Sequence, residues 1–370
     1  MAYGNLNVDT VTTSTAGGVL GAGNASIMKN RLINGNFMIS QYNGSSSTTP
    51  TDNGFGTDRW KFTLSQASKL TCQQNAGSVT PPTGFSNYLG ITSSSAYSVG
   101  ASDYFAVYQR IEGFNTADLG WGTANAKTVT LSFQVYSSLT GTFGGAILNS
   151  AVNRSYPFTY TISSANTWTS ISVTIAGDTS GTWVGATNGI GMMVSFGLGV
   201  GSSSSGTAGA WNSNSFCVSA TGATSVVGTN GATFYITGVQ LEVGSSATGY
   251  EYRQYQQELA LCQRYYFKTF AQGTAPIQNV GSTLGALLVS TSATSTFGGS
   301  LPLPVTMRAN PTTVTTYNPS VANANWRDAN NTADRTVNSS GGNDSALYVV
   351  GLAGIVNGLN YIHLTASAEL

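Results

Sequence analysis

Charged residues are scarce in this chain of 370 residues. Asp, Glu, Lys and Arg together make up 8% of the sequence, against about 25% in average soluble domains. The 14 basic and 14 acidic side chains balance to a formal net charge of zero, and no basic cluster occurs. Because binding to a phosphate backbone requires grouped Lys and Arg, we expect no nucleic acid partner.

Long hydrophobic runs are also missing. Hydrophobic residues form 41% of the sequence, but the best candidate span, 189–201, is short and interrupted by glycine. A membrane-spanning helix needs about 18–20 consecutive apolar residues, so we expect no membrane insertion. Residues 1–10 carry neither a basic segment nor an apolar stretch, and the sequence therefore predicts no signal peptide.

Cysteine and histidine are too few for most catalytic or zinc-binding schemes. Cys72, Cys217 and Cys262 are widely spaced and form no Cys/His cluster, so we interpret them as free, buried thiols and leave a single disulfide open. The sole histidine, His363, has no nucleophile motif near it, and we expect it to face solvent or an interface. The carboxylates are scattered rather than paired, so the sequence predicts no enzyme, no catalytic residues and no required cofactor.

What is abundant is glycine, with 45 residues, and short stretches of alternating apolar and polar residues. In residues 30–250 this period-two pattern, separated by Gly-rich turns, predicts an all-β sandwich. One strand, 192–200, carries glycine at 197 and 199 on its second face, which we interpret as a place where another segment packs closely, with a second subunit as one candidate. The strands show the alternation at Val129, Leu131, Phe133 and Val135, at Ile171, Val173 and Ile175, and at Met192, Val194, Phe196, Leu198 and Val200.

Residues 251–268 differ from the rest because they predict a helix. Five residues follow spacings of three and four, which is the seam of a heptad pattern. A connector helix packed on its own domains and a short three-helix junction on an oligomer axis are both compatible with this seam. Its members are Tyr252, Tyr255, Leu259, Cys262 and Tyr266.

Residues 269–370 predict a second, smaller β-sandwich domain. Its last strand alternates cleanly, with Ile362, Leu364 and Ala366 on one face and His363 and Thr365 on the other. The fold class predicted for the chain is thus all-β: a β-sandwich, one short helix, and a second β-sandwich.

Several short segments resemble bacteriophage tail-fibre and related virion structural proteins with a carbohydrate-binding-module-like jelly roll. They bracket residues 30–250 and recur in the helix and the C-terminal domain. The segments are Asn-Arg-Leu-Ile-Asn-Gly-Asn-Phe at 30–37, Thr-Asp-Arg-Trp at 57–60, Phe-Tyr-Ile-Thr-Gly-Val-Gln-Leu-Glu at 234–242, Tyr-Glu-Tyr-Arg at 250–253, Cys-Gln-Arg-Tyr-Tyr at 262–266, and residues 3–10, 301–312 and 361–370.

The resemblance implies a homotrimeric tail fibre in the virion, made in the host cytoplasm. Residues 1–29 would be an attachment arm to other tail or adaptor proteins, although a loosely held terminus explains them equally well. Residues 269–370 would be the tip that contacts host surface glycans. A head fibre or capsid decoration protein, a polysaccharide depolymerase and a plain lectin remain alternatives.

The same resemblance implies one set of site residues, and the residue types found in the loops indicate a second. A structural calcium joining the first and last strands of the jelly roll would take oxygen ligands from Asn34, Asn36 and Glu242. Sugar contacts would come from aromatic rings in loops, with polar neighbours to orient hydroxyl groups. The candidates are Trp121, Trp183, Trp211 and Trp326, with Arg327 and Asp328 beside the last, and a purely structural role is the alternative for each tryptophan.

Overall fold

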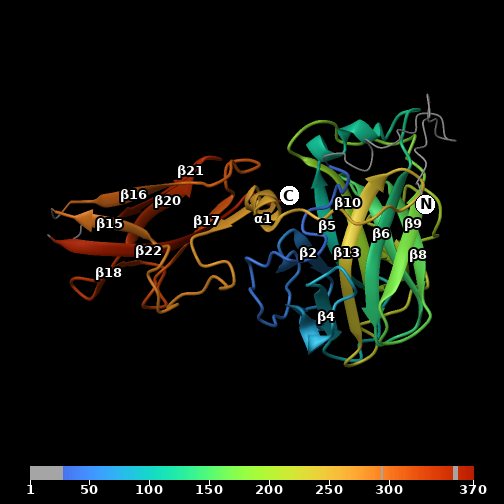
Figure 1. Ribbon diagram of the computed structural model, residues 1–370, viewed down its shortest axis with the longest axis horizontal. Coiled ribbons are helices and arrows are strands. Elements are labelled where there is room, and N and C mark those ends of the chain that lie inside the picture. Colours follow the sequence, from blue (N-terminus) through green and yellow to red (C-terminus); the bar gives the residue numbers. More distant parts are fainter. Residues whose placement is uncertain (1–27, 293–294, 353–356) are drawn as a thin grey trace, which may run out of the picture.

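The computed structural model describes residues 28–292, 295–352 and 357–370. The predicted attachment arm therefore lies outside the described residues, apart from its last two positions. The chain forms two lobes with a short helix between them (Figure 1). Within the described ranges every sheet is built from antiparallel strands except one two-residue parallel pair. The all-β prediction, with one short helix and a second, smaller sandwich, is confirmed.

The larger lobe contains two packed sheets. The first has six strands in the order β1-β2-β5-β10-β7-β8, and the second has five in the order β3-β4-β13-β6-β9. The first sheet comprises β1 (Phe55–Thr57), β2 (Trp60–Leu64), β5 (Tyr104–Glu112), β10 (Ile190–Val200), β7 (Gly141–Asn149) and β8 (Ser155–Ile162). The second comprises β3 (Leu70–Gln74), β4 (Leu89–Ser93), β13 (Thr233–Val243), β6 (Val129–Ser137) and β9 (Thr169–Ile175).

The core between these sheets consists of the apolar residues that the alternation selected. Val129, Leu131, Phe133 and Val135 of β6 are all buried in it, and Ile171 and Val173 of β9 pack against it. The polar residues between them lie on the outer face of the five-stranded sheet, as the two-residue period of a strand requires. That outer face is where the candidate site lies.

The glycine face of β10 is not open to a second subunit. Met192, Val194, Phe196 and Leu198 enter the main core, while the opposite face is covered by residues 202–228 of the same chain. A Cβ on Gly197 would lie 2.8 Å from Ser219 Cβ. The predicted close packing on this face is confirmed, but a subunit contact there is wrong, because a segment of the same chain occupies the space that glycine leaves. The covering segment contains three short elements, η5 (Ser202–Ser204), β11 (Ser205–Gly206) and β12 (Ser219–Ala220). Elsewhere the larger lobe has 3-10 turns at η2 (Ala76–Ser78), η3 (Gly113–Asn115) and η4 (Ala117–Leu119).

Helix α1 (Tyr255–Gln263) connects the two lobes and is shorter than predicted, because residues 251–254 are extended and β14 (Tyr266–Lys268) follows. A nine-residue helix is marginal in isolation, so packing must stabilise it. Leu259 and Cys262 are buried against Ile33 and Ile39 of the sandwich. None of the described helices has the length and apolar character needed to cross a bilayer.

The predicted oligomer seam is therefore mostly an internal contact. Leu259, Cys262 and Tyr266 are 6%, 0% and 6% exposed, whereas Tyr252 and Tyr255 are 59% and 46% exposed. The prediction that all five contact another subunit is wrong, because three of them pack inside one chain. The connector interpretation of this helix describes what the structure contains.

The smaller lobe is organised around β22 (Gly358–Ser367), which pairs with four other strands. Ile362, Leu364 and Ala366 of β22 enter the core of this lobe, as the alternation predicted. A three-stranded sheet packs on the other side of that core. The partners of β22 are β14, β15 (Leu287–Thr291), β17 (Thr313–Tyr317) and β18 (Trp326–Asp328). Strand β18 also pairs with β19 (Ala333–Arg335). The three-stranded sheet consists of β16 (Phe297–Pro302), β21 (Ala346–Gly351) and β20 (Val337–Gly342).

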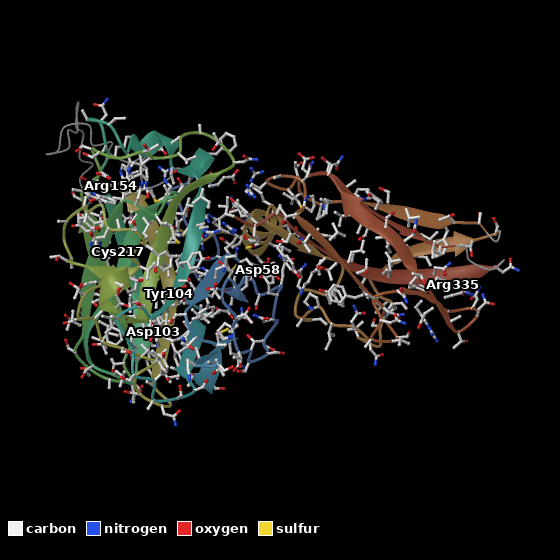
Figure 2. The ribbon with its side chains drawn as sticks, turned by 180° about the vertical axis from the view of Figure 1, so that it is seen from behind. Asp58, Asp103, Tyr104, Arg154, Cys217 and Arg335 are labelled. Atoms are coloured by element: carbon white, nitrogen blue, oxygen red, sulfur yellow. The ribbon has the colours of Figure 1, made fainter. Side chains whose placement is uncertain are left out.

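The two lobes meet through buried charged and aromatic groups. Asp58 lies at this junction (Figure 2) and accepts two hydrogen bonds from Gln41, which also donates to the Tyr266 carbonyl at 3.1 Å. Lys268 donates to the carbonyl oxygens of Gln41, Gln272 and Thr274 at 2.7–2.9 Å. Segments far apart in the sequence are thus joined by hydrogen bonds around α1.

Candidate functional site

Three of the predicted sugar-binding tryptophans come together at one end of the sandwich. Trp121, Trp183 and Trp211 contact one another edge to face, with ring centroids 4.7, 5.3 and 5.5 Å apart. Each indole N–H donates to a group of the protein. Trp121 donates to Lys127 O, Trp183 to Asp178 Oδ2 and Ser180 O, and Trp211 to Ala176 O. The cluster packs on the main core and closes the end of the sandwich.

The space beside these tryptophans is small. The cavity next to Trp121 and Trp183 has a volume of about 40 Å³, which is room for a few water molecules. The rings use their faces and edges on one another and on the core. The sequence selected residues that lie together in space, and their role in this structure is packing.

The fourth tryptophan is not in a loop. Trp326 begins β18 and is completely buried, where it contacts Phe297 edge to face at 5.2 Å. Asp328 is also buried and binds Arg335 and Asn331, while Arg327 pairs with Asp334 at 3.2 Å. The prediction that Trp326, Arg327 and Asp328 contact a ligand is wrong. The Trp326 ring is packed in the core, the Asp328 carboxylate is bound by Arg335 and Asn331, and the Arg327 side chain is paired with Asp334.

The residues implied for calcium do not fit such an ion. The Asn34 side chain donates to Ile39 O and Asp58 O and accepts from Ile39 N at 2.8–3.0 Å. The Glu242 carboxylate accepts from Gln240 and twice from Thr248. Of the three, Asn36 alone keeps an oxygen without a hydrogen-bond partner among the described residues. In residues 28–292, 295–352 and 357–370 no group of three or more His, Cys, Asp or Glu side chains is placed to hold a metal.

Protein hydrogen bonds join the first segment to the last strand instead. Asn30 Nδ2 donates to Val239 O, and its Oδ1 accepts from the backbone N–H of Leu32 and of Leu241 at 3.0–3.1 Å. Arg253 donates to the carbonyls of Asn30 and Leu32 and pairs with Glu251 at 2.8 Å. A buried network of charge-assisted hydrogen bonds thus connects the first segment to the last strand of the sandwich, which is the connection that the resemblance assigned to calcium.

The sandwich has an open hollow on the outer face of the five-stranded sheet, which we call the sheet-face hollow. It has a volume of about 340 Å³ and is bounded by β6, β9, the loop around Phe85 and residues 247–252. The lining residues, all within the described ranges, carry no formal charge. They are Phe85, Ser132, Phe133, Gln134, Ser170, Ile171, Ser172, Gly238, Ala247, Thr248, Gly249, Tyr250 and Tyr252.

The floor of this hollow is polar. Gln134 of β6 and Ser170 of β9 are directly opposite in the antiparallel pair, and their side chains hydrogen-bond at 2.8 and 3.0 Å. Ser132 and Ser172 are the next pair on the same face. The Gln134 amide keeps one N–H and one lone pair beyond its bonds to Ser170, so it can bind a ligand hydroxyl in either role.

One wall of the hollow is aromatic. Phe85, Tyr250 and Tyr252 contact one another, with centroids 5.1–5.7 Å apart. Tyr250 is half-buried, and burial raises the pKa of its hydroxyl. Tyr252 leaves 59% of its surface exposed at the rim. An exposed ring beside amide and hydroxyl groups is the arrangement that binds a sugar ring and orients its hydroxyl groups.

Sequence reasoning missed this hollow for identifiable reasons. The sequence pattern assigns Tyr252 only to the helix seam, and it gives the polar residues of the strand around Gln134 no role. The alternation placed Gln134 on the outer face, but nothing local in the sequence indicated that Tyr252 returns to the same face.

The titratable groups predicted to be non-catalytic lie elsewhere. His363 is buried rather than facing solvent: Nδ1 bonds Thr269 Oγ1 and Nε2 bonds Ser282 O, both at 2.9 Å, and burial lowers its pKa. The expectation of an exposed or interface histidine is therefore wrong, because residues 269–282 cover that face. Cys72, Cys217 and Cys262 are free and buried, as predicted.

Comparisons with known proteins give a coarse result. No family model matches the chain, and no curated protein matches it. Solved structures similar to it include tailspike protein 4 of bacteriophage CBA120, at 12% identity and a TM-score of 0.32, covering 58% of this chain and 22% of the tailspike. A CBM4 module is 14% identical with a TM-score of 0.29, covering 55% of this chain and all of that one. A putative sugar binding protein from Bacteroides thetaiotaomicron VPI-5482 is 14% identical with a TM-score of 0.33, and the match covers 58% of this chain and 100% of that one.

These likenesses are distant. The chain spans about a fifth of the tailspike that it matches. Identities of 12–14% and TM-scores near 0.3 do not show a family for this chain.

Proposed function

We propose that this chain is a glycan-binding structural protein of a virion, and that the sheet-face hollow is its glycan site. The observation that carries the proposal is the exposed Tyr252 ring beside the Gln134–Ser170 pair in an uncharged hollow. The ring would pack on the apolar face of a pyranose, and the amide and hydroxyl groups would bind its equatorial hydroxyls. The lack of charge on the lining favours a neutral saccharide.

The virion role is supported by the segments that resemble phage tail-fibre proteins. In this proposal residues 1–29 attach the fibre to other tail or adaptor proteins, and residues 269–370 form a tip near host surface glycans. A head fibre or capsid decoration protein would share these domains and differ in its attachment. We propose no enzymatic activity, because the hollow has no carboxylate pair in its lining.

A homotrimer remains part of the proposal, without an assigned contact surface, since most of the predicted seam is buried within one chain. Three weak sites on one particle-bound fibre would raise the overall avidity by about 10²–10⁴ over a single site. Sedimentation or light scattering of the full chain tests this directly. A monomer at micromolar concentration would contradict the trimer while leaving the glycan site untouched.

The glycan proposal is tested with full-length protein on an array of neutral glycans. The variant Tyr252→Ala removes the exposed ring, and Tyr255→Ala is the matched control, because Tyr255 is also exposed but does not line the hollow. We expect Tyr252→Ala to weaken binding at least about tenfold, as loss of one stacked ring does, and Tyr255→Ala to leave it unchanged. Equal binding by both variants, or no binding by the unaltered chain, would contradict the site.

The host-binding part has its own test. Purified full-length protein is mixed with host cells before phage is added, and adsorption is counted. Inhibition of adsorption by the unaltered chain but not by Tyr252→Ala supports a receptor role for the hollow. Failure of both to inhibit, with glycan binding intact, would favour a decoration protein.

No cofactor is proposed, and calcium removal provides a check. The polar atoms of Asn34 and Glu242 are already engaged by protein groups, so a chelator should not lower the thermal unfolding midpoint. A fall of several degrees that added calcium reverses would show that a metal site exists.

A further inference from the structure

A second hollow lies where the two lobes meet, and we call it the junction hollow. It has a volume of about 330 Å³. Tyr42 of the sandwich forms one wall, and β14, β17 and β22 of the smaller lobe form the rest. It shares no lining residue with the sheet-face hollow.

The floor of the junction hollow is a grid of hydroxyl groups. Thr313 of β17 is paired with Ser367 of β22, and Thr315 is paired with Thr365. Residues two apart on a strand share a face and lie about 7 Å apart, and directly paired residues lie about 4.5–5.5 Å apart. Neither the Thr313 nor the Thr315 hydroxyl has a hydrogen-bond partner among the described residues. Both hydroxyls are therefore free to donate to a ligand and accept from it.

The aromatic wall is rigid and neutral. Tyr42 is stacked between Phe55 and Tyr266, with ring centroids 4.1 and 3.8 Å away. Burial raises the pKa of both tyrosine hydroxyls, so neither ionises near neutral pH. No residue that lines the hollow carries a formal charge. Tyr317 lies at the same hollow and adds a third phenol.

We propose that the junction hollow is a second saccharide site, which binds a neutral, polyhydroxylated sugar independently of the sheet-face hollow. The Thr313 and Thr315 hydroxyls bind sugar hydroxyl groups, and Tyr42 and Tyr266, which are stacked on each other, border the sugar as a wall. A hydroxyl grid beside aromatic rings, without charge, suits a sugar better than an anion or a peptide terminus, since both of these require a charged partner. Because the walls come from both lobes, a bound sugar also bridges them.

The test uses the full chain carrying Tyr252→Ala, which removes the contribution of the sheet-face hollow. Glucose, galactose, mannose, rhamnose and N-acetylglucosamine are probed at millimolar concentration by saturation-transfer NMR. The variant Thr313→Val/Thr315→Val is added to remove both hydroxyls at nearly constant volume. The matched control is Thr159→Val/Thr161→Val, two exposed threonines two apart on β8 that line neither hollow.

We expect at least one sugar to give a transfer signal with the Tyr252→Ala chain. Adding Thr313→Val/Thr315→Val to that chain should abolish the signal, and adding the control pair should leave it unchanged. Loss of every signal on Tyr252→Ala alone would overturn the proposal, and so would a signal that survives Thr313→Val/Thr315→Val. Failure of the sheet-face site is seen separately, as unchanged array binding by Tyr252→Ala. Circular dichroism melting confirms that each variant is folded.

Discussion

The guanidinium of Arg59 lies 3.5 Å from the centroid of the Tyr265 ring, and this contact joins the sandwich to the segment after α1. Arg59 also forms an ion pair with Glu369, and both side chains are less than 10% exposed. The junction between the lobes therefore contains a charge that is paired, stacked and removed from water. Such a pair is sensitive to the loss of one partner, because the other charge is left buried.

Removal of the Arg59 charge should destabilise the chain strongly. We expect Arg59→Met to lower the free energy of unfolding by about 3–5 kcal/mol, and Arg59→Met/Glu369→Met to recover much of that loss, because no charge then remains buried. Urea unfolding of both variants measures this. As a control, Lys127→Met removes an exposed pair with Asp118 and should cost less than about 1 kcal/mol. A double variant no more stable than the single one would contradict this account of the junction.

Asp58 should make stability depend on pH. Burial raises the pKa of its carboxyl to about 6, and the nearby charge of Glu369 adds to this increase. The hydrogen bonds from Gln41 and the charge of Lys268 lower the pKa, but by less. A raised folded-state pKa means that the folded chain holds a proton that the unfolded chain releases, so this contribution is present below pH 4 and is lost as pH rises through about 6. Relative to Asp58→Asn, we expect the unaltered chain to gain roughly 2 kcal/mol between pH 7.5 and 4.5. Urea midpoints across that range measure the difference, and parallel pH profiles would refute the shift.

Trp326 should matter for stability and not for binding. It is fully buried in the core of the smaller lobe. Trp326→Ala should cost about 3–5 kcal/mol, because it leaves a large cavity, and Trp326→Phe should cost less. Both measurements come from urea unfolding alongside the glycan array. Loss of glycan binding by a still folded Trp326→Phe variant would restore its assignment as a ligand residue.

Gly197 should tolerate no side chain, although a second subunit was one candidate for the neighbour of its strand face. A Cβ there would lie 2.8 Å from Ser219 Cβ of the same chain, and overpacking of this kind costs about 1–3 kcal/mol. Gly197→Ala should therefore lower the unfolding midpoint equally at all protein concentrations. The control Gly185→Ala should be neutral, because no atom lies within 4 Å of its added Cβ. An effect of Gly197→Ala that depends on protein concentration would indicate a subunit contact.

Local patterns were enough to predict much of the sandwich. The period of two in β6 and β9 selected which residues enter the core, and the same period placed Gln134 and Ser170 on the outer face. For the candidate site the sequence supplied only that polar floor. The aromatic wall comes from Phe85 and Tyr252, which are 167 positions apart in the chain, and no local signal relates them.

The errors have a common physical cause. A pattern states which side of a strand or helix is apolar or small, and it does not state what covers that side. Gly197 needed a close neighbour, and the neighbour is Ser219 of the same chain. Leu259, Cys262 and Tyr266 needed an apolar partner, and both lobes of the same chain supply it.

The sequence alone thus determined the all-β class, the strand faces and the low, balanced charge, because these depend on residue type and short-range spacing. Tertiary structure alone decided which faces stay open to solvent. Of the aromatic residues considered for ligand contact, Trp326 became core and the other three tryptophans closed one end of the sandwich. Tyr252 stayed exposed, because the chain between β13 and α1 passes along the rim of the sheet and leaves its ring in water.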